Sequence, residues 1–369
     1  MSILFETTEI NGMKLRNRFV RSATWEGMAS PEGAVTPKLI DTMAALARGG
    51  VGLIISSHAY VRKEGQASPW QIGVYQDELI DGLREMTAAV HEAGGTMALQ
   101  LAHAGHFAAE QITGTPPLVV SDYAGLAQTP RKEMMVKDFE ELVTAFADAA
   151  VRAKSAGFDG VQIHAAHGYL LSQFLSPAFN RRLDNYGGSI RNRSRIHLEI
   201  LHAIRKVVGG DYPVLVKLNC RDFAENGLSL EDSISTAGLL ADAGLDAIEL
   251  SGGLLTGGGK LSPSRSRIDS EDKEAYFREE LRAFKKQIRI PLILVGGIRS
   301  FGIADELVEE GAADYISMCR PFIWEPDLIA RWKAGDRRKA ECKSDNLCFM
   351  PGLEGNGIQC VTKQRQEIT

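Results

Sequence analysis

The sequence predicts a (β/α)8 TIM barrel, an α/β fold, with long loops at the C-terminal face of the barrel. Two observations support this fold class. Short apolar runs rich in β-branched residues alternate with amphipathic stretches along the whole 369-residue chain. Runs such as GLIIS, PVLVKL and PLILV are apolar on both faces, as in strands that helices cover on both sides. A doubly wound open sheet is the alternative fold for the same alternation.

Eight strands are expected, and each is a short apolar run. In chain order they span Arg18–Thr24, Gly52–His58, Thr96–His103, Gly160–Ala166, Pro213–Cys220, Ala247–Gly253, Pro291–Gly297 and Tyr315–Pro321. The stretches between them include helical patterns such as TPKLIDTMAALARGG and DELIDGLREMTAAVHEAGG. Several of these patterns end in Ala-Gly or Gly-Gly, as expected just past the C-terminus of a helix.

Three of the segments that follow predicted strands are long. They span Ala104–Val136, Gly168–Ile190 and Leu254–Asp272, after the third, fourth and sixth strands. Loops of this length in a compact domain are usually functional. Barrel enzymes carry their active sites at the C-terminal ends of the strands. We therefore expect the functional site at this end of the barrel.

The composition favours a small-molecule enzyme of the cytoplasm. The net charge is −5 without a basic run, which argues against a nucleic-acid partner. No apolar stretch approaches the roughly 20 residues of a membrane span, and the N-terminus MSILFETTEING lacks the features of a signal peptide. Five cysteines, an odd number, indicate free thiols in a reducing compartment. A homo-oligomer is left open.

Five histidines lie at or just past predicted strand ends: His58, His103, His106, His164 and His167. Clustered neutral imidazoles could bind a metal, as in metal-dependent hydrolase barrels. Alternatively, His164 and His167 could donate hydrogen bonds to an oxygen that gains negative charge during a reaction. The metal site would need an H-x-H pair on the first strand and an Asp at the end of the eighth. These strands read RFVRSATW and YISMCRP, so the second interpretation is favoured.

The last two strands predict a phosphate site. Gly296, Gly297, Arg299 and Arg320 fall at adjacent strand ends. Glycines allow backbone N–H groups to approach phosphate oxygens, and arginine adds a bidentate partner. Loops after the seventh and eighth strands form such a site in many barrels.

Gln100 and Lys217 interrupt otherwise apolar strands and should point into the mouth of the barrel. Burying the Lys217 charge is costly without an anionic partner. That partner could be a protein carboxylate such as Glu249, or a ligand with an anionic ring nitrogen whose imide edge would match the Gln100 amide.

These residues lie within longer motifs: LRNRFVRSAT, LQLAHAGH, HAAHGYLLSQFLSPAFNRRLDNYGGSIRNRSR, VGGIRS and CRPFIWEPDL. Over nearly its full length the chain resembles the Old Yellow Enzyme family of FMN-dependent, NAD(P)H-using ene-reductases. It is similar in particular to the barrel domain of 2-enoate and 2,4-dienoyl-CoA reductases. The third motif is the most specific, because H-x-x-H-G-Y-L and the downstream Y-G-G-S rarely occur together elsewhere.

The resemblance implies a catalytic set in which His164 and His167 bind the carbonyl oxygen of an alkene substrate and Tyr169 donates a proton. Trp25 joins the two histidines in the expected substrate site, at a position where the family often carries Cys or Thr. The cofactor-binding residues implied for FMN are Ala23, Thr24, Trp25, His58, Gln100, Lys217, Gly253, Gly296, Gly297, Arg299, Cys319 and Arg320. An amine dehydrogenase or demethylase is the alternative on the same barrel, but those relatives place Tyr where His164 stands.

The C-terminal segment ECKSDNLCFMPGLEGNGIQC resembles the iron-sulfur segment of the larger relatives. Cys342, Cys348 and Cys360 match three cluster ligands, but Asp345 stands at the fourth position. Since such clusters usually take four cysteines, we expect a remnant without a [4Fe–4S] cluster, and no other metal. The expected organisation is an FMN-binding barrel at residues 1–335 and this tail at residues 336–369.

Overall fold

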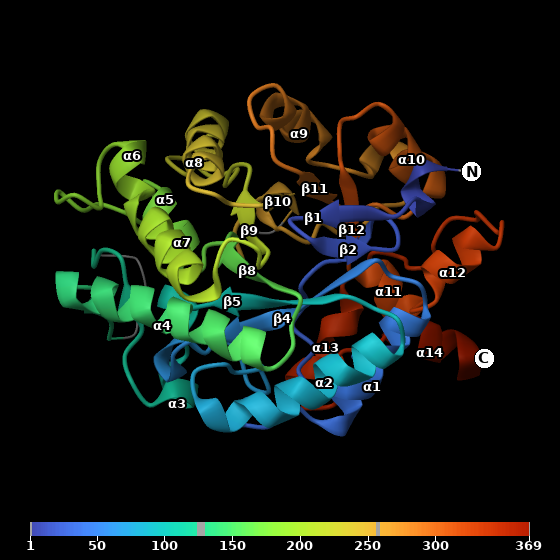
Figure 1. Cartoon of the computed structure of the whole chain (residues 1–369), viewed down its shortest axis with the longest axis horizontal. Helices are drawn as coiled ribbons and strands as arrows, with labels where there is room; N and C mark the ends of the chain where they lie inside the picture. Colours follow the sequence, from blue (N-terminus) through green and yellow to red (C-terminus); the bar gives the residue numbers. More distant parts are fainter. Residues whose placement is uncertain (1, 124–129, 256–258, 369) are drawn as a thin grey trace.

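The computed structural model describes residues 2–123, 130–255 and 259–368 and contains a closed barrel of eight parallel strands (Figure 1). Around the barrel the strand order is β10-β11-β12-β3-β4-β5-β8-β9. Their bounds are β3 Phe19–Arg21, β4 Leu53–Tyr60, β5 Met97–Ala102, β8 Gly160–Ala165, β9 Val214–Asn219, β10 Ala247–Ser251, β11 Leu292–Val295 and β12 Tyr315–Met318. Each predicted strand overlaps one of these, so the predicted (β/α)8 barrel is confirmed.

The eighth predicted strand was too long. Strand β12 ends at Met318, and helix α11 (Arg320–Trp324) begins two residues later. Pro321 lies in the first turn of this helix, where its fixed φ and missing N–H are well tolerated. Arg320 is therefore at a helix N-terminus rather than on a strand.

Helices surround the barrel on its outside (Figure 1). The longer ones are α1 Pro37–Arg48, α2 Ile80–Glu92, α4 Val136–Ser155, α7 Arg195–Val208, α8 Leu230–Asp242, α9 Arg278–Lys285, α10 Phe301–Glu309 and α12 Leu328–Lys333. Helix α7 shows why they pack there: Ile196, Ile200, Leu201 and Ile204 recur at helical spacing and are all buried. None of the helices in the described ranges has the length and apolar character needed to cross a bilayer.

A hairpin closes the N-terminal end of the barrel. It is formed by β1 (Thr8–Ile10) and β2 (Met13–Leu15), which pair antiparallel. Its residues Ile10, Met13 and Leu15 pack with Val20 and Leu53 from the barrel interior. This end of the barrel is therefore apolar, and the polar cavity lies at the other end.

The predicted loops contain short elements. The segment after β5 holds α3 (Glu110–Thr113), β6 (Leu118–Val119) and β7 (Lys132–Glu133), and the segment after β8 holds α5 (Leu170–Leu175) and α6 (Ile190–Arg193). Residues 124–129 and 256–258 of two of these loops lie outside the described residues. The C-terminal tail adds α13 (Met350–Leu353) and α14 (Val361–Ile368).

Candidate active site

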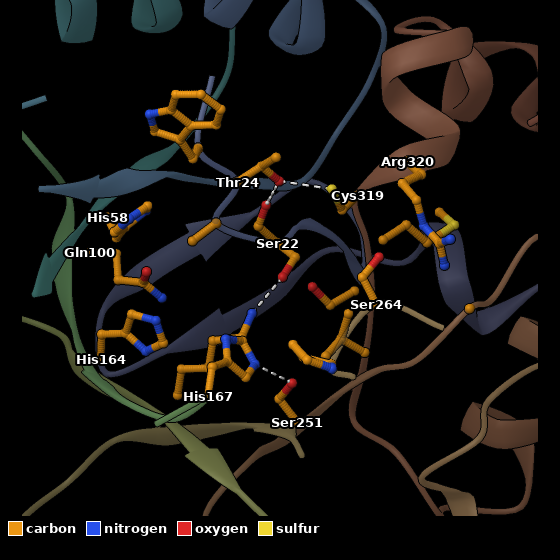
Figure 2. Close-up of a pocket in the computed structure, with 18 of the residues that line it drawn as sticks. Ser22, Thr24, His58, Gln100, His164, His167, Ser251, Ser264, Cys319 and Arg320 are labelled. Carbon is orange, nitrogen blue, oxygen red and sulfur yellow. Dashed lines mark hydrogen bonds between the residues drawn. The ribbon is translucent and has the colours of Figure 1, made fainter. Parts of the chain in front are cut away.

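A cavity at the C-terminal ends of the strands brings together most of the predicted site residues (Figure 2). Among the residues that line it are Ala23, Thr24, Trp25, His58, Gln100, His164, His167, Tyr169, Lys217, Gly297, Cys319 and Arg320. Of the predicted set, Gly253, Gly296 and Arg299 do not line it. Segments far apart in the sequence thus converge on one site.

The end of β8 places His164, His167 and Tyr169 next to one another. The ring centroid of His164 lies 5.2 Å from that of His167 and 4.9 Å from that of Tyr169. His167 has a left-handed backbone (φ 66°), and its N–H donates to the Asn219 side chain at 3.1 Å. The turn thereby aims both imidazoles at the same cavity.

Burial fixes the protonation states of this group. It lowers the pKa of both His164 and His167 well below 6.5, and the neighbouring imidazole groups and Lys217 add to the effect. Burial likewise raises the pKa of the Tyr169 phenol above its usual range of about 10. At neutral pH the turn after β8 therefore presents two neutral imidazoles and a protonated phenol to the cavity.

The nitrogens of the two imidazoles have different partners. His167 Nε2 is 2.8 Å from the Ser251 hydroxyl. His164 Nδ1 is buried and has no hydrogen-bond partner among the described residues. An unpartnered buried polar atom at a cavity is costly unless a ligand or water satisfies it. His164 Nδ1 is therefore the nitrogen of this pair that a ligand oxygen could satisfy.

The other predicted histidines have different surroundings. His58 lines the cavity, with its Nε2 atom 3.3 Å from the Tyr169 hydroxyl, and burial lowers its pKa to about 4. His103 and His106 do not line the cavity. The His103 ring accepts a hydrogen bond from the Gly105 N–H, and His106 stacks on Phe179. These last two histidines are packed structural groups.

Lys217 pairs with a protein carboxylate, which is one of the two kinds of anionic partner that the sequence left open. Its ammonium lies 3.1 Å from the Glu249 carboxylate, and both side chains are buried. The Ser22 hydroxyl connects the two, since it accepts from Lys217 at 2.6 Å and donates to Glu249 at 2.7 Å. Lys217 also lines the cavity, so its charge faces any ligand bound there.

The Glu249 carboxylate sets the direction of a chain of hydrogen bonds. Gln162 donates its amide N–H to Glu249 at 2.9 Å, and its amide oxygen accepts from Gln100 at 2.7 Å. Because an ionised carboxylate can only accept, this direction is fixed. The Gln100 side-chain oxygen is then left as an acceptor at the cavity wall.

Of the predicted phosphate-binding residues, Gly297 and Arg320 line the cavity, whereas Gly296 and Arg299 do not. The cavity end at Gly297 and Arg320 is the predicted phosphate end. Gly297 has φ 74°, and a Cβ there would lie 2.7 Å from the Tyr276 ring. Arg299 is directed elsewhere, because its guanidinium donates to the carbonyls of Ile268 and Ala340. Arg299 does not line the cavity, and its place in the phosphate site stays a prediction.

The hydrogen-bond donors of Trp25 and Thr24 are already engaged by other groups of the protein. The Trp25 indole N–H donates to the Pro69 carbonyl at 3.2 Å, so it is not offered to a ligand. The Thr24 hydroxyl lies 2.9 Å from the Cys319 sulfur and donates to the Ser22 carbonyl at 3.0 Å. Both residues contribute shape to the cavity rather than a free donor.

Within the ranges that the structure describes, no group of three or more His, Cys, Asp or Glu side chains is arranged to hold a metal ion. Cys342, Cys348 and Cys360 are free thiols. Burial raises the pKa of Cys348 to about 12 and also raises that of Cys342 and Cys360. All three therefore stay protonated at neutral pH.

The geometry agrees with a family comparison. A profile described as the NADH:flavin oxidoreductase / NADH oxidase family matches residues 3–339. The chain belongs to this family. Its barrel is that of the Old Yellow Enzyme group, which uses FMN with NAD(P)H as electron donor.

Curated relatives of this flavin oxidoreductase include two with different redox partners in their names. An NADH oxidase of Thermoanaerobacter brockii is 36% identical over 354 residues, which cover 95% of this chain and 54% of the relative. An NADPH dehydrogenase of Geobacillus sp. is 35% identical over 326 residues, which cover 88% of this chain and 92% of the relative. The chain thus spans about half the length of some relatives and nearly all of others.

The solved structures that resemble this chain also include both a much longer chain and one of similar length. A 2-naphthoyl-CoA reductase superposes with a TM-score of 0.89 at 26% identity, covering 97% of this chain and 56% of that one. The Old Yellow Enzyme homologue from Zymomonas mobilis superposes with a TM-score of 0.78 at 26% identity, covering 98% of each chain. The resemblance stated from the motifs is therefore confirmed.

Several residues of the flavin oxidoreductase cavity were missed by sequence reasoning. They are Ser22, Ser251, Ser264, Tyr276, Ser317 and Phe349. The serines at strand ends carried a usable signal, since RSAT, ELSGG and YISM each place a small polar residue at the mouth. Phe349 carried none, because it comes from the tail and its position depends on how the tail folds back.

Proposed function

We propose that this chain is an FMN-dependent oxidoreductase that uses NAD(P)H to reduce activated carbon–carbon double bonds, such as those of α,β-unsaturated carbonyl compounds. The observation that carries the proposal is the combination at the end of β8. Two neutral imidazoles and a protonated phenol meet at one cavity, with ring centroids about 5 Å apart.

The residues present fit FMN at both ends of the cavity. Gln100 offers an acceptor for the imide N–H of the flavin, and Lys217 brings a positive charge beside it. At the other end, Gly297 lines the cavity with a backbone conformation that glycine adopts easily, and Arg320 suits a phosphate. These residues would hold the pyrimidine edge and the phosphate, respectively.

When bound, the flavin supplies the hydride that the β-carbon of the alkene receives. His164 and His167 bind the carbonyl oxygen of the substrate, and their hydrogen bonds stabilise the negative charge that develops on it. Tyr169 holds the proton that the α-carbon needs, and burial keeps this phenol protonated until it is used. The three residues of one turn thus act on two atoms of the substrate: the histidines on the carbonyl oxygen and Tyr169 on the α-carbon.

The test replaces the oxygen-binding pair. In His164→Ala with His167→Ala, we expect NAD(P)H-dependent reduction of 2-cyclohexenone to fall by about 10² to 10³-fold, as when donors to a developing oxyanion are removed. Binding of phenols, which offer an oxygen to the same pair, should weaken with it. His202 is exposed on α7, so His202→Ala is the matched control and should behave as wild type. Unchanged turnover in the double variant would contradict the proposal.

A further inference from the structure

The C-terminal tail reaches the phosphate end of the cavity through one residue. The Asn346 side-chain oxygen accepts a hydrogen bond from Arg320 Nη1 at 2.8 Å. Its amide N–H donates to the Ser264 carbonyl at 2.9 Å, and the Ser264 hydroxyl donates back to its oxygen at 3.1 Å. Asn346 therefore joins the arginine of α11 to the loop that follows β10.

This contact determines which edge of Arg320 remains available. Arg320 Nη1 also donates to the Arg265 carbonyl at 2.8 Å, so both hydrogens of that nitrogen are engaged by protein oxygens. Arg320 is buried to 7% exposure and lines the cavity (Figure 2). The Nε and Nη2 atoms form the other edge of the guanidinium, which is the geometry for a two-point contact with a phosphate.

The turn that presents Asn346 is itself held by hydrogen bonds. Asn346 has φ 65°, a left-handed conformation that Asn adopts more readily than most residues. Asp345, which stands at the position of the missing cysteine, accepts from the Leu347 N–H at 3.1 Å and from the Thr362 hydroxyl at 2.5 Å. The Ser344 carbonyl accepts from the Arg267 N–H at 3.1 Å, which ties the turn to the β10 loop.

The tail also forms part of the cavity wall. Phe349, in the 3-10 turn Leu347–Phe349, lines the cavity, and a Cβ on Gly352 would lie 3.0 Å from the Trp25 ring. The Ile358 N–H donates to the Glu26 carbonyl at 2.7 Å. The segment therefore packs against the site at several points while its cysteines remain neutral thiols.

From these contacts we propose that the tail positions Arg320 for binding the phosphate of FMN. Asn346 is the positioning residue: it holds one edge of Arg320 so that the other edge faces the phosphate. The cysteine-bearing segment thus acts on cofactor binding through the hydrogen bonds of Asn346. This inference rests on the proposed function, since it takes FMN as the ligand of this end.

The test separates the phosphate from the flavin ring. The apoprotein is titrated with FMN and with riboflavin, which lacks the phosphate, and binding is followed by quenching of flavin fluorescence. The variant is Asn346→Gly, because glycine adopts positive φ without strain. We expect its Kd for FMN to rise about tenfold, in line with the loss of a hydrogen bond to a charged group. Its Kd for riboflavin should stay at the wild-type value.

Asn356→Gly is the matched control, since Asn356 is exposed on the same tail and does not line the cavity. Both of its Kd values should equal those of the wild type. Equal weakening of FMN and riboflavin in Asn346→Gly, or no weakening of either, would overturn the inference. If Asn346→Gly does not fold, Asp345→Ala decides instead, and an unchanged preference for FMN in that variant would overturn the inference too. A wild-type protein that binds neither flavin, or both alike, would instead contradict the assignment of FMN to this cavity.

Discussion

At the scale of single residues, the site works through protonation states that burial imposes. His164 and His167 stay neutral because desolvation lowers their pKa values, with smaller contributions from the neighbouring imidazoles and from Lys217. Tyr169 stays protonated because the same burial raises its pKa. The proposed proton donor and the proposed oxygen-binding groups thus have different protonation chemistry, although they lie in one turn of the chain.

Tyr169→Phe should separate the two halves of the catalytic cycle. The phenol hydroxyl is lost while the ring remains, so flavin reduction by NAD(P)H should keep its wild-type rate. Alkene reduction should slow by about 10²-fold or more for weakly activated substrates, which depend most on a positioned acid. Stopped-flow absorbance measures each half separately. Equal slowing of both would show that Tyr169 has another role.

The buried Lys217–Glu249 ion pair should contribute to the free energy of unfolding. Glu249→Gln should lower the free energy of unfolding by about 3 kcal/mol or more, since it leaves the Lys217 charge buried without its partner. Lys217→Met combined with Glu249→Gln should cost less than the sum of the single changes, because the pair is then removed together. Urea unfolding without added flavin provides the four values. Strictly additive losses would mean that the pair is not coupled.

At the scale of elements, the ends of β11 and β12 shape the phosphate end. Strand β11 ends just before Gly296 and Gly297, and β12 gives way to α11 at Arg320. The chain turns sharply at both places, so backbone and guanidinium reach the same space. This arrangement depends on a conformation that only glycine adopts easily at Gly297.

Gly297→Ala should therefore weaken FMN binding by about tenfold or more. The added Cβ would meet the Tyr276 ring at 2.7 Å, on a backbone with φ 74° that is strained for alanine. Gly302→Ala in α10 is the matched control, because nothing lies within 4 Å of its Cβ position and alanine favours a helix. Fluorescence titration with FMN compares them. Wild-type affinity in Gly297→Ala would show that this glycine does not contribute to FMN binding.

At the scale of the whole molecule, burial of neutral histidines links stability to pH. Burial lowers the pKa of His197 on α7 from 6.5 to about 4. As pH falls below 6.5, the unfolded chain binds this proton first, so the free energy of unfolding decreases until about pH 4. His58 and His106 contribute in the same direction, with pKa values also lowered to about 4.

His197→Gln should remove one part of this dependence. Glutamine can still donate to the Leu171 carbonyl, which the His197 ring contacts at 3.0 Å, but it does not titrate. Between pH 6.5 and 4, the variant should lose about 3 kcal/mol less stability than the wild type. Chemical unfolding at a series of pH values measures both slopes, and parallel slopes would contradict a neutral buried His197.

Most of the fold follows from local patterns, and the site follows in part. Short apolar runs with β-branched residues predict all eight barrel strands, and the ends of these runs predict where His164 and His167 lie. The break that Lys217 makes in an apolar run predicts that it faces the mouth of the barrel. The contacts of Arg299 with the carbonyls of Ile268 and Ala340 could not be predicted, because only the folded loop and tail bring these carbonyls to it. The start of α11 lies inside the predicted eighth strand, although Pro321 is typical of a first helical turn and unusual inside a strand.

FMN is proposed to lie across the open end of the barrel, and a crystal structure of the FMN-loaded chain would show whether it does. We expect the phosphate within hydrogen-bond distance of Arg320 and the Gly297 backbone. The pyrimidine edge should lie on Gln100 and Lys217, with His164 and His167 above the ring. A flavin bound elsewhere, or turned so that its phosphate leaves Arg320 without contact, would contradict the account.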